Sequence, residues 1–393
     1  MKLGIRNIGQ IATGDLEKPL AEADTIVCDA GRITGIGVPK GALDACEVVI
    51  DANGATAAPG LIDSHVHITF GDFTPRQNVV GYLSSYVHGG VTTSISASEV
   101  HVPGRPHDRG GLKALALAAR ACFEGYRPGG MRVHAGSVIL DPTLELSDLA
   151  ELAAAGIWLA KAGFGAFDDA FDYAPYVKAA REAGMITTVH TGGSSIPGSG
   201  AISGDHILAL DPHVSFHVNG GPTAMPDADF KRLATESEVA LQICTAGNLR
   251  TALLCLEEAR KADALHRLLI ATDTPTGSGV MPLGLLYTMS HLSALGGLAP
   301  ELAIACATGN NARVYGLEAG VLKEGRLADV ILLDAPDGGT QRTALNAIRH
   351  GDIAAVGAVI SSGVPRFVGR SRNTPATCRE MRVERCDIPA SFD

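Results

Sequence analysis

Short apolar segments alternate with amphipathic segments over most of the 393-residue chain. Segments such as Val239–Thr245 and Leu268–Asp273 are mainly apolar and contain β-branched residues, which is typical of buried strands. Between them lie segments such as Asn248–Lys261, where apolar residues recur every three to four positions, as on one face of a helix. This alternation predicts a parallel sheet with helices packed outside it.

The segments of the central region form a series of eight strand candidates. These are Leu61–Ile68, Val91–Ala97, Met131–Ile139, Ile157–Ala162, Ile186–Thr191, Val214–Val218, Val239–Thr245 and Leu268–Asp273. Helices are expected at Leu112–Gly125, Leu146–Ala155, Ala174–Gly184, Asp227–Thr235 and Asn248–Lys261, with one more at Glu301–Tyr315. Eight strand–helix repeats predict an α/β fold in which residues 59–317 form a (β/α)8 TIM-like barrel.

The two ends of the chain have a different pattern, with short β-branched segments separated by Gly, Asp and Asn. Such segments are Lys2–Ile8, Thr25–Asp29, Ile33–Ile36 and Val48–Asp51 near the start, and Ala328–Asp334, Ile353–Ile360 and Arg366–Val368 near the end. We predict that residues 1–58 and 318–370 together form one small β-sandwich domain beside the barrel. Residues 371–393 are expected to form a polar C-terminal tail on the surface.

The composition and net charge of the chain indicate which kinds of binding partner and which location to expect. The net charge is −10, which disfavours binding to nucleic acid or to an anionic membrane surface. We find no run of about 18 apolar residues that would predict a membrane span. The first residues show no apolar stretch of signal-peptide length, and the eight cysteines are scattered, so we expect buried free thiols and a cytoplasmic location.

Side chains that can bind metal stand where several predicted strands end. His65 and His67 are separated by one residue at the end of the first strand, so both side chains point to the same face. The carboxyl ends of all strands in an eight-fold barrel face one mouth, where residues far apart in sequence converge. The candidate ligands are His65, His67, Lys161, His190, His217 and Asp273.

The chemistry of these residue types fits a metal-activated hydrolysis. Imidazole nitrogens and carboxylate oxygens are ligands that zinc-like divalent ions prefer. A lysine buried beside cations loses its proton more readily, and the neutral amine can take up carbon dioxide to form a carbamate that bridges two metals. We therefore predict two divalent ions, zinc with iron as the alternative at one site, bridged by an N6-carboxylated Lys161. Water held between two ions becomes a nucleophile near neutral pH, and Asp273 would pass its proton to the leaving nitrogen.

Each of these residues also has an ordinary structural interpretation. A single histidine at a strand end is often a hydrogen-bonded core residue, Lys161 alone could form a salt bridge at the rim, and Asp273 could cap a turn. The consistent placement of all six at strand ends favours the metal site. Arg76 and Arg105, in loops after the first two strands, are candidates to bind a substrate carboxylate, or else they are ordinary loop arginines.

Three motifs carry a family resemblance. The segment Ala58-Pro-Gly-Leu-Ile-Asp-Ser-His-Val-His67 resembles the opening motif of the amidohydrolase superfamily. The segment Glu324-Gly-Arg-Leu-Ala-Asp-Val-Ile-Leu-Leu-Asp334 resembles the return of these proteins into their β domain, and Ala307-Thr-Gly-Asn-Asn-Ala312 is similar to their late helix.

Further stretches are similar to the enamidases, the members of this superfamily that open a six-membered cyclic enamide. Among them are His190-Thr-Gly-Gly-Ser-Ser-Ile-Pro-Gly198 and Asn219-Gly-Gly-Pro-Thr-Ala224. The resemblance implies a homotetramer. It also implies that one metal is bound by His65, His67 and Asp273 and the other by His190 and His217. In the enamidase pattern a glutamate bridges the metals, whereas this chain has Lys161; a carboxylated lysine is common elsewhere in the superfamily.

The sequence thus predicts a binuclear metal-dependent hydrolase that cleaves the C–N bond of a small cyclic amide, which could carry a carboxylate. A hydantoinase-like or dihydroorotase-like enzyme and a linear amide deacylase are the open alternatives. A mononuclear deaminase is disfavoured because such enzymes lack the bridging lysine, and no glutamate follows closely after His190 or His217. A non-catalytic relative is disfavoured because such proteins lose ligands, whereas here all six are present.

Overall fold

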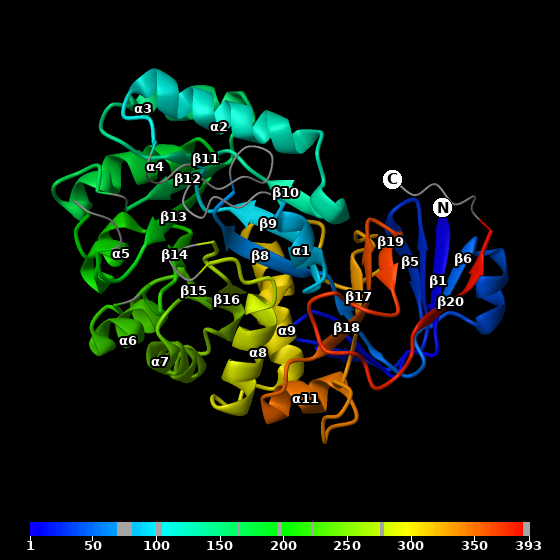
Figure 1. Ribbon diagram of the computed structural model, residues 1–393. Helices are drawn as coiled ribbons and strands as arrows, with labels where there is room; N and C mark the ends of the chain where they lie inside the picture. The colour runs from blue at the N-terminus through cyan, green and yellow to red at the C-terminus, as the bar shows by residue number, and fades with distance from the viewer. Residues whose placement is uncertain are drawn as a thin grey trace.

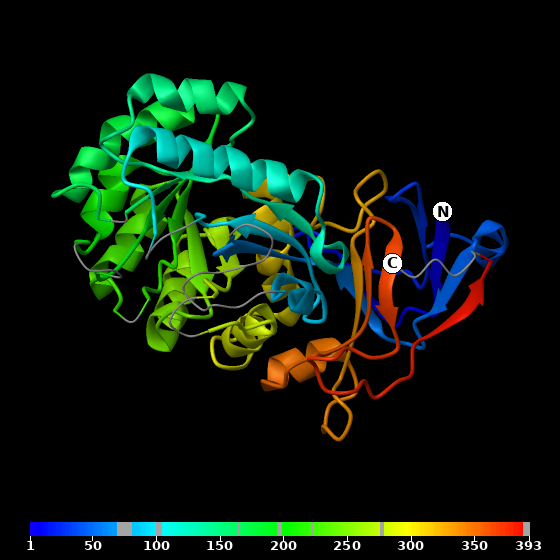
Figure 2. The same ribbon diagram turned by 45° about the horizontal axis from the view of Figure 1, so that its top comes forward.

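The computed structural model describes residues 1–68, 81–99, 104–163, 165–194, 199–221, 223–275 and 279–387. These residues form two parts that lie side by side in Figures 1 and 2. One part consists of parallel strands covered by helices, and the other consists of β-sheets to which both ends of the chain contribute. The predicted alternation of strands and helices in the central region is confirmed.

The parallel strands follow one another in sequence order. They are β8 (Leu61–Val66), β9 (Val91–Ser96), β10 (Arg132–His134), β11 (Ser137–Ile139), β12 (Leu159–Ala162), β13 (Ile186–His190), β14 (Val214–Phe216), β15 (Ala240–Cys244) and β16 (Leu268–Ala271). Strands β8, β9 and β10 form one sheet, and β11 to β16 form a second, with every neighbouring pair parallel.

The predicted strand Met131–Ile139 is interrupted, so that its first half pairs with β9 and its second half with β12. The backbone turns at Gly136, whose φ of 95° suits glycine. The buried carboxylate of Glu99 accepts hydrogen bonds from the backbone N–H groups of Gly136 (2.6 Å) and Ser137 (3.0 Å). A side chain thus bonds to backbone groups at the break, and the strands divide into two hydrogen-bonded sheets.

The other ends of the two sheets meet directly after β8 and β16. Val66 and Thr274 form a parallel bridge, and the His67 N–H donates to the Thr274 carbonyl at 2.8 Å. The Asp273 N–H donates to the His65 carbonyl at 2.9 Å. These contacts bring the ends of the first and last strands of the series together.

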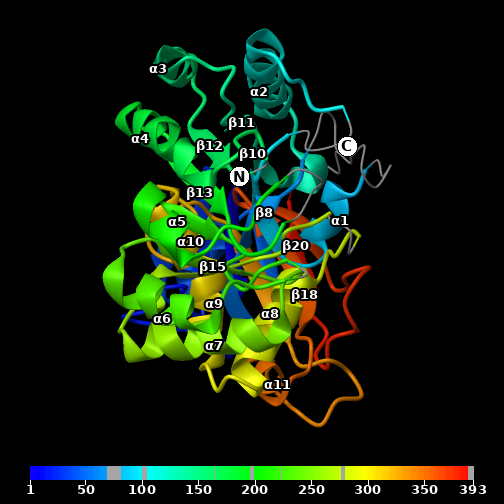
Figure 3. The ribbon, with the colours of Figure 1, turned by 90° about the vertical axis from the view of Figure 1, so that its left-hand side faces the viewer.

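Helices surround the parallel strands, as Figure 3 shows for α2 to α8. The helices are α1 (Leu83–Val87), α2 (Arg109–Glu124), α3 (Leu146–Ala154), α4 (Ala174–Glu182), α5 (Gly204–Leu210), α6 (Asp227–Glu236), α7 (Leu249–Lys261), α8 (Gly284–Ala294), α9 (Pro300–Ala307), α10 (Gly309–Val314) and α11 (Ala344–His350). Short 3-10 turns lie at η1 (Lys40–Ala45), η3 (Pro128–Gly130), η4 (Ala170–Tyr173) and η5 (Leu265–Arg267). The predicted single helix Glu301–Tyr315 is two helices, because the backbone of Thr308 (φ −135°, ψ −84°) breaks the helical path.

Two further sheets combine strands from both ends of the chain. The strands are β1 (Lys2–Arg6), β2 (Gln10–Ala12), β3 (Leu20–Ala21), β4 (Ile26–Asp29), β5 (Arg32–Ile36), β6 (Val48–Asp51), β7 (Thr56–Pro59), β17 (Val330–Asp334), β18 (Ala355–Ser361), β19 (Val364–Val368) and β20 (Arg382–Cys386). Their orders are β20-β6-β1-β4-β5 and β19-β18-β17-β7-β2-β3. Leu3, Ile50, Leu332 and Ile360 belong to one buried apolar cluster drawn from both sheets.

Strand β20 lies in the segment for which the sequence predicted only a polar tail. It pairs antiparallel with β6, opposite residues near the start of the chain. Its side chains are largely exposed, so the strand carries little of the apolar alternation that marks a buried strand.

Candidate metal centre

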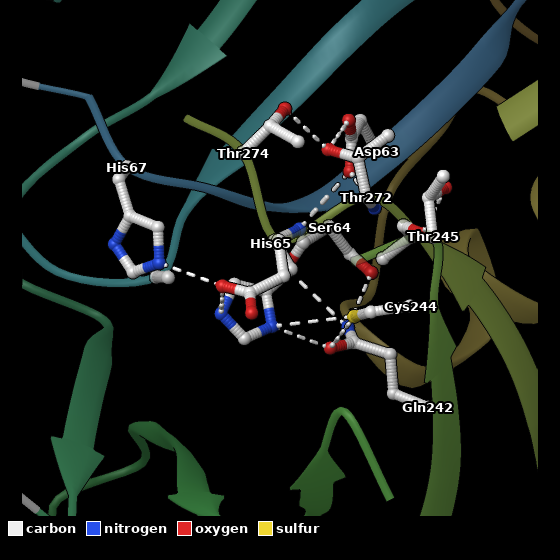
Figure 4. A network of polar contacts seen from close by, with 12 residues as sticks. Asp63, Ser64, His65, His67, Gln242, Cys244, Thr245, Thr272 and Thr274 are labelled. Carbon is white, nitrogen blue, oxygen red and sulfur yellow. Dashed lines mark hydrogen bonds and ion pairs between the residues drawn. The ribbon is translucent and has the colours of Figure 1, made fainter. Parts of the chain in front are cut away.

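Three of the predicted ligands meet where β8 and β16 end. His65 lies in β8, His67 follows that strand by one residue, and Asp273 lies two residues beyond β16. The Asp273 Oδ1 atom is 3.0 Å from His65 Nε2 and 2.8 Å from His67 Nε2 (Figure 4 shows the two histidines). All three residues are buried, and one ligand atom from each lies within 4.8 Å of the others, so that together they could hold a metal ion.

Two more imidazoles lie beside this group. His190 ends β13, and His217 follows β14 by one residue. Their ring centroids are 4.5 Å apart, and the His217 ring lies 5.4 Å from the His65 ring. The structure therefore brings the four predicted histidines and Asp273 together at the carboxyl ends of the strands.

Lys161 lies within β12 and is completely buried. Its Nζ atom is 4.1 Å from the centroid of the Phe216 ring, and the same ring lies 3.9 Å from the His65 ring. Burial lowers the pKa of Lys161 to about 7, although the nearby Asp273 and Cys244 act in the opposite direction. A large share of this side chain is therefore a neutral amine at physiological pH, the form that carbamate formation requires.

The protonation states of the other ligands also suit a cation. Burial lowers the pKa of His190 to about 4, helped by the charge of Lys161, and it lowers the pKa of His217 well below its usual range. Both imidazoles are therefore neutral and keep a lone pair. Burial alone would raise the pKa of Asp273, but the imidazoles of His65 and His67 outweigh this effect and hold it well below its usual range.

Hydrogen bonds indicate which nitrogen of His190 is available. His190 Nε2 lies 2.8 Å from the Gly193 carbonyl oxygen, which can only accept, so Nε2 carries the proton and Nδ1 carries the lone pair. The Nδ1 atom of His217 is buried and has no hydrogen-bond partner among the described residues. Neutral imidazoles, an ionised carboxylate and a buried nitrogen with no protein partner in the described ranges together fit a divalent cation.

The backbone is strained at two of these positions. Asp273 and His217 have φ angles of 59° and 34°, a left-handed conformation that residues with a Cβ atom rarely adopt. Such conformations cost about 1–3 kcal/mol and concentrate at functional sites. Hydrogen bonds from the N–H groups of Asp273 and Val218 to neighbouring strands hold the two residues in place.

Asp63 supports the site but was not predicted as a functional residue. Its buried carboxyl group accepts hydrogen bonds from Thr272 Oγ1 (2.6 Å), the Thr272 N–H (3.0 Å) and the His65 N–H (3.3 Å). It therefore links β8 to the segment that carries Asp273. Burial raises its pKa to about 7, against these hydrogen bonds. The sequence placed Asp63 in the opening motif, but only the fold shows which residues it contacts.

Of the two arginines predicted to bind substrate, the structure describes only Arg105. Arg76 lies outside the described residues. Arg105 is buried in the segment that precedes α2. Binding of a substrate carboxylate by these residues remains a prediction.

Comparison with known proteins identifies the class. Residues 56–364 match the Amidohydrolase family, so the chain belongs to this family. It is 40% identical over 381 residues to the enamidase of Eubacterium barkeri, which covers 96% of this chain and 98% of that protein. The crystal structure of enamidase matches with a TM-score of 0.93 and 40% identity, covering 98% of this chain and 100% of that one. The chain is thus a homologue of enamidase and a hydrolase of the amidohydrolase class, which confirms both predicted resemblances.

More distant relatives also match most of the chain. The imidazolonepropionase of Salinispora tropica is 26% identical over 400 residues, covering 92% of this chain and 97% of that protein. A D-hydantoinase structure matches with a TM-score of 0.69 at 16% identity, covering 95% of this chain, and this likeness shows the fold alone. Within the described ranges, no helix combines the length and the apolar character that crossing a membrane requires.

Proposed function

We propose that this chain is a binuclear metal-dependent hydrolase that opens a small cyclic amide at its C–N bond, as its likeness to enamidase suggests. The observation that carries the proposal is the meeting of four imidazoles and Asp273 at the strand ends. Lys161, whose burial lowers the pKa of its amine to about 7, lies in the same group of strands.

The proposed metal ligands divide into two groups. His65, His67 and Asp273 would hold one divalent ion, and His190 and His217 would hold the second. Carboxylated Lys161 would bridge the two, with zinc as the ion and iron as the alternative at one site. Such a pair of ions, when bound, polarises a carbonyl group and acidifies water.

The protein's own groups would orient the substrate and move the proton. Asp273 is ionised and can accept a proton from the attacking water and deliver it to the leaving nitrogen. Neutral His190 and His217 leave their lone pairs available instead of adding positive charge to the site. Arg76 and Arg105 would bind a carboxylate on the substrate, if it carries one.

The finer architecture is part of the proposal. We infer that residues 59–317 form a closed (β/α)8 barrel, because the strand order follows the sequence and the ends of β8 and β16 are linked by hydrogen bonds. Residues 1–58 and 318–370 would form the β-sandwich, supported by the apolar cluster that draws on both sheets. Strand β20 adds part of the tail, residues 371–393, to that unit. The proposal also includes a homotetramer, which the family resemblance suggests, and a cytoplasmic location.

Other reactions of the same class remain alternatives, namely hydantoinase-like or dihydroorotase-like ring opening and linear amide deacylation. A mononuclear deaminase is disfavoured by the buried Lys161 beside the histidines. A screen of cyclic enamides, lactams, hydantoins, cyclic imides and linear amides with metal-loaded protein would separate these reactions. Hydrolysis of cyclic substrates with two ions per chain is expected. One ion per chain, or no turnover of any cyclic amide, would overturn the proposal.

The bridging role has its own test. The Lys161→Ala variant should lose most of its metal and activity, and a small carboxylic acid such as propionate should restore part of both. The control is Lys178→Ala, because the Lys178 side chain is 77% exposed on α4 and should not affect either quantity. Full activity of the Lys161 variant without any added acid contradicts the bridge.

A further inference from the structure

A chain of hydrogen bonds begins at Asn311, a buried residue of α10. Its side-chain Nδ2 atom donates to three backbone carbonyls, those of Ile62 (3.3 Å), Ile270 (3.2 Å) and Cys306 (3.1 Å). Carbonyl oxygens only accept, so these contacts fix which end of the amide is nitrogen. The Oδ1 atom must then face the other way, where it lies 2.6 Å from Ser64 Oγ.

The orientation of the Asn311 amide determines which atom donates in the hydrogen bonds that Ser64 and Gln242 form. Ser64 must donate its hydroxyl proton to Asn311, so its oxygen is left to accept. Gln242 Nε2 donates to that oxygen at 2.8 Å and lies 3.5 Å from the Ser64 carbonyl oxygen. Gln242 Oε1 therefore points the opposite way, to His65 Nδ1 at 2.8 Å (Figure 4).

The result is a defined tautomer of His65. An amide oxygen can only accept, so Nδ1 carries a proton, and in the neutral imidazole Nε2 then carries the lone pair. That lone pair faces Asp273 Oδ1 at 3.0 Å. Either a proton or a metal ion can lie between these two atoms, and with Nδ1 held protonated by Gln242 it is Nε2 that is left to bind a metal ion.

We propose that Gln242 is a positioning residue that fixes the tautomer and ring orientation of His65, and that Ser64 and Asn311 fix Gln242. The proposal rests on the metal site put forward under "Proposed function". The positioning role accounts for Ser64, Gln242 and Asn311, three buried polar residues that have no part in the proposed chemistry. Ser64 and Asn311 stand in two of the family-like motifs, whereas Gln242 lies in β15, where the sequence shows no motif.

The first test reads the tautomer in metal-free protein. Two-bond 1H–15N spectra of histidine-labelled protein at pH 7.5 should show His65 protonated at Nδ1, with its signal assigned by its loss in His65→Gln. The Gln242→Leu variant should lose this preference. The Gln242→Glu variant should keep it, because a carboxylate oxygen also accepts from Nδ1–H. A neutral His65 that carries its proton on Nε2 in the wild type, or an unchanged tautomer in Gln242→Leu, would overturn the proposal.

The second test measures the affinity for Co²⁺ from its visible absorption. Gln242→Leu and Asn311→Ala should weaken binding by about 10–100-fold, the usual effect of removing a group that orients a ligand. Gln242→Glu should retain binding within a few-fold. The control is Asn310→Ala, because Asn310 lies beside Asn311 but donates to the carbonyls of Leu265 (2.9 Å) and Leu268 (2.8 Å), away from the chain of hydrogen bonds.

The control variant Asn310→Ala should have a lower thermal stability than the wild type and an unchanged affinity for Co²⁺. Equal losses of affinity in the Asn310 and Asn311 variants, or wild-type affinity in Gln242→Leu, would contradict the positioning role. If the wild type binds no Co²⁺, the proposed metal function fails, and the tautomer measurement on metal-free protein still decides whether Gln242 controls His65.

Discussion

Replacement of Lys161 by Met should stabilise the metal-free protein at neutral pH. Lys161 is completely buried, and burial lowers its pKa from 10.5 to about 7. One unit of pKa difference between folded and unfolded states corresponds to about 1.4 kcal/mol, so the charged lysine costs about 5 kcal/mol on folding. Methionine is similar in length and has no charge to desolvate, so the variant avoids this cost.

The effect should depend on pH in a defined direction. Between pH 7 and pH 10.5 the unfolded chain holds the lysine proton and the folded chain has released it. Wild-type stability therefore rises with pH through this window. The destabilisation by Lys161 is fully present below about pH 7 and absent above about pH 10.5, so the advantage of the Met variant should decline over the same range.

The assay is urea unfolding of chelator-treated proteins, followed by circular dichroism at pH 7 and pH 10 in buffer free of carbon dioxide. Lys178→Met is the control, because this side chain is 77% exposed. Its free energy of unfolding should change by less than about 0.5 kcal/mol. A Lys161→Met variant that is less stable than the wild type at pH 7, or that differs from it equally at both pH values, refutes the reasoning.

Further changes test the site and the packing around it. Asp273→Asn should keep the fold, measured by circular dichroism, while kcat of metal-loaded protein falls by about 10²–10⁴-fold; undiminished turnover would rule out its role in proton transfer. Gly60→Ala would place a Cβ atom 2.0 Å from Thr92 Oγ1 and should lower the free energy of unfolding by about 1–3 kcal/mol. Gly125→Ala, which meets no atom within 4 Å, should not show this loss, and equal urea midpoints for the two would count against the clash. Phe216→Ala removes a fully buried ring and should cost about 3–5 kcal/mol in urea unfolding; a loss under 1 kcal/mol is incompatible with its packing.

The sequence was most informative about where the strands end. Most strands of the central region begin with apolar residues, and residues that can bind metal stand where several of these strands end. His190 and His217 could therefore be assigned to strand ends, and the structure places both rings near His65. Their roles as metal ligands stay a prediction, because sequence and geometry alone do not show what they bind.

Other features depend on contacts that the sequence does not reveal. Gln242 is one polar residue within an apolar strand, and nothing in its neighbourhood shows that it faces His65 and Ser64. The break at Gly136 depends on hydrogen bonds to Glu99, which lies 37 residues away in the sequence. Such partners are set by the tertiary arrangement of the strands and not by local periodicity.

The interleaving of both chain ends in the β-sheets has a consequence for biosynthesis. Strand β7 pairs with β17, and Ala57 lies opposite Leu332. This pairing cannot form until the ribosome has added Leu332, 275 residues after Ala57. At about 5–20 residues added per second, the edge of β7 that pairs with β17 stays unpaired for tens of seconds. The parallel strands of the central region have already been synthesised during this time. Ribosome-bound chains halted before residue 330 should consequently be cut by protease in the first 58 residues, and chains released after completion should resist.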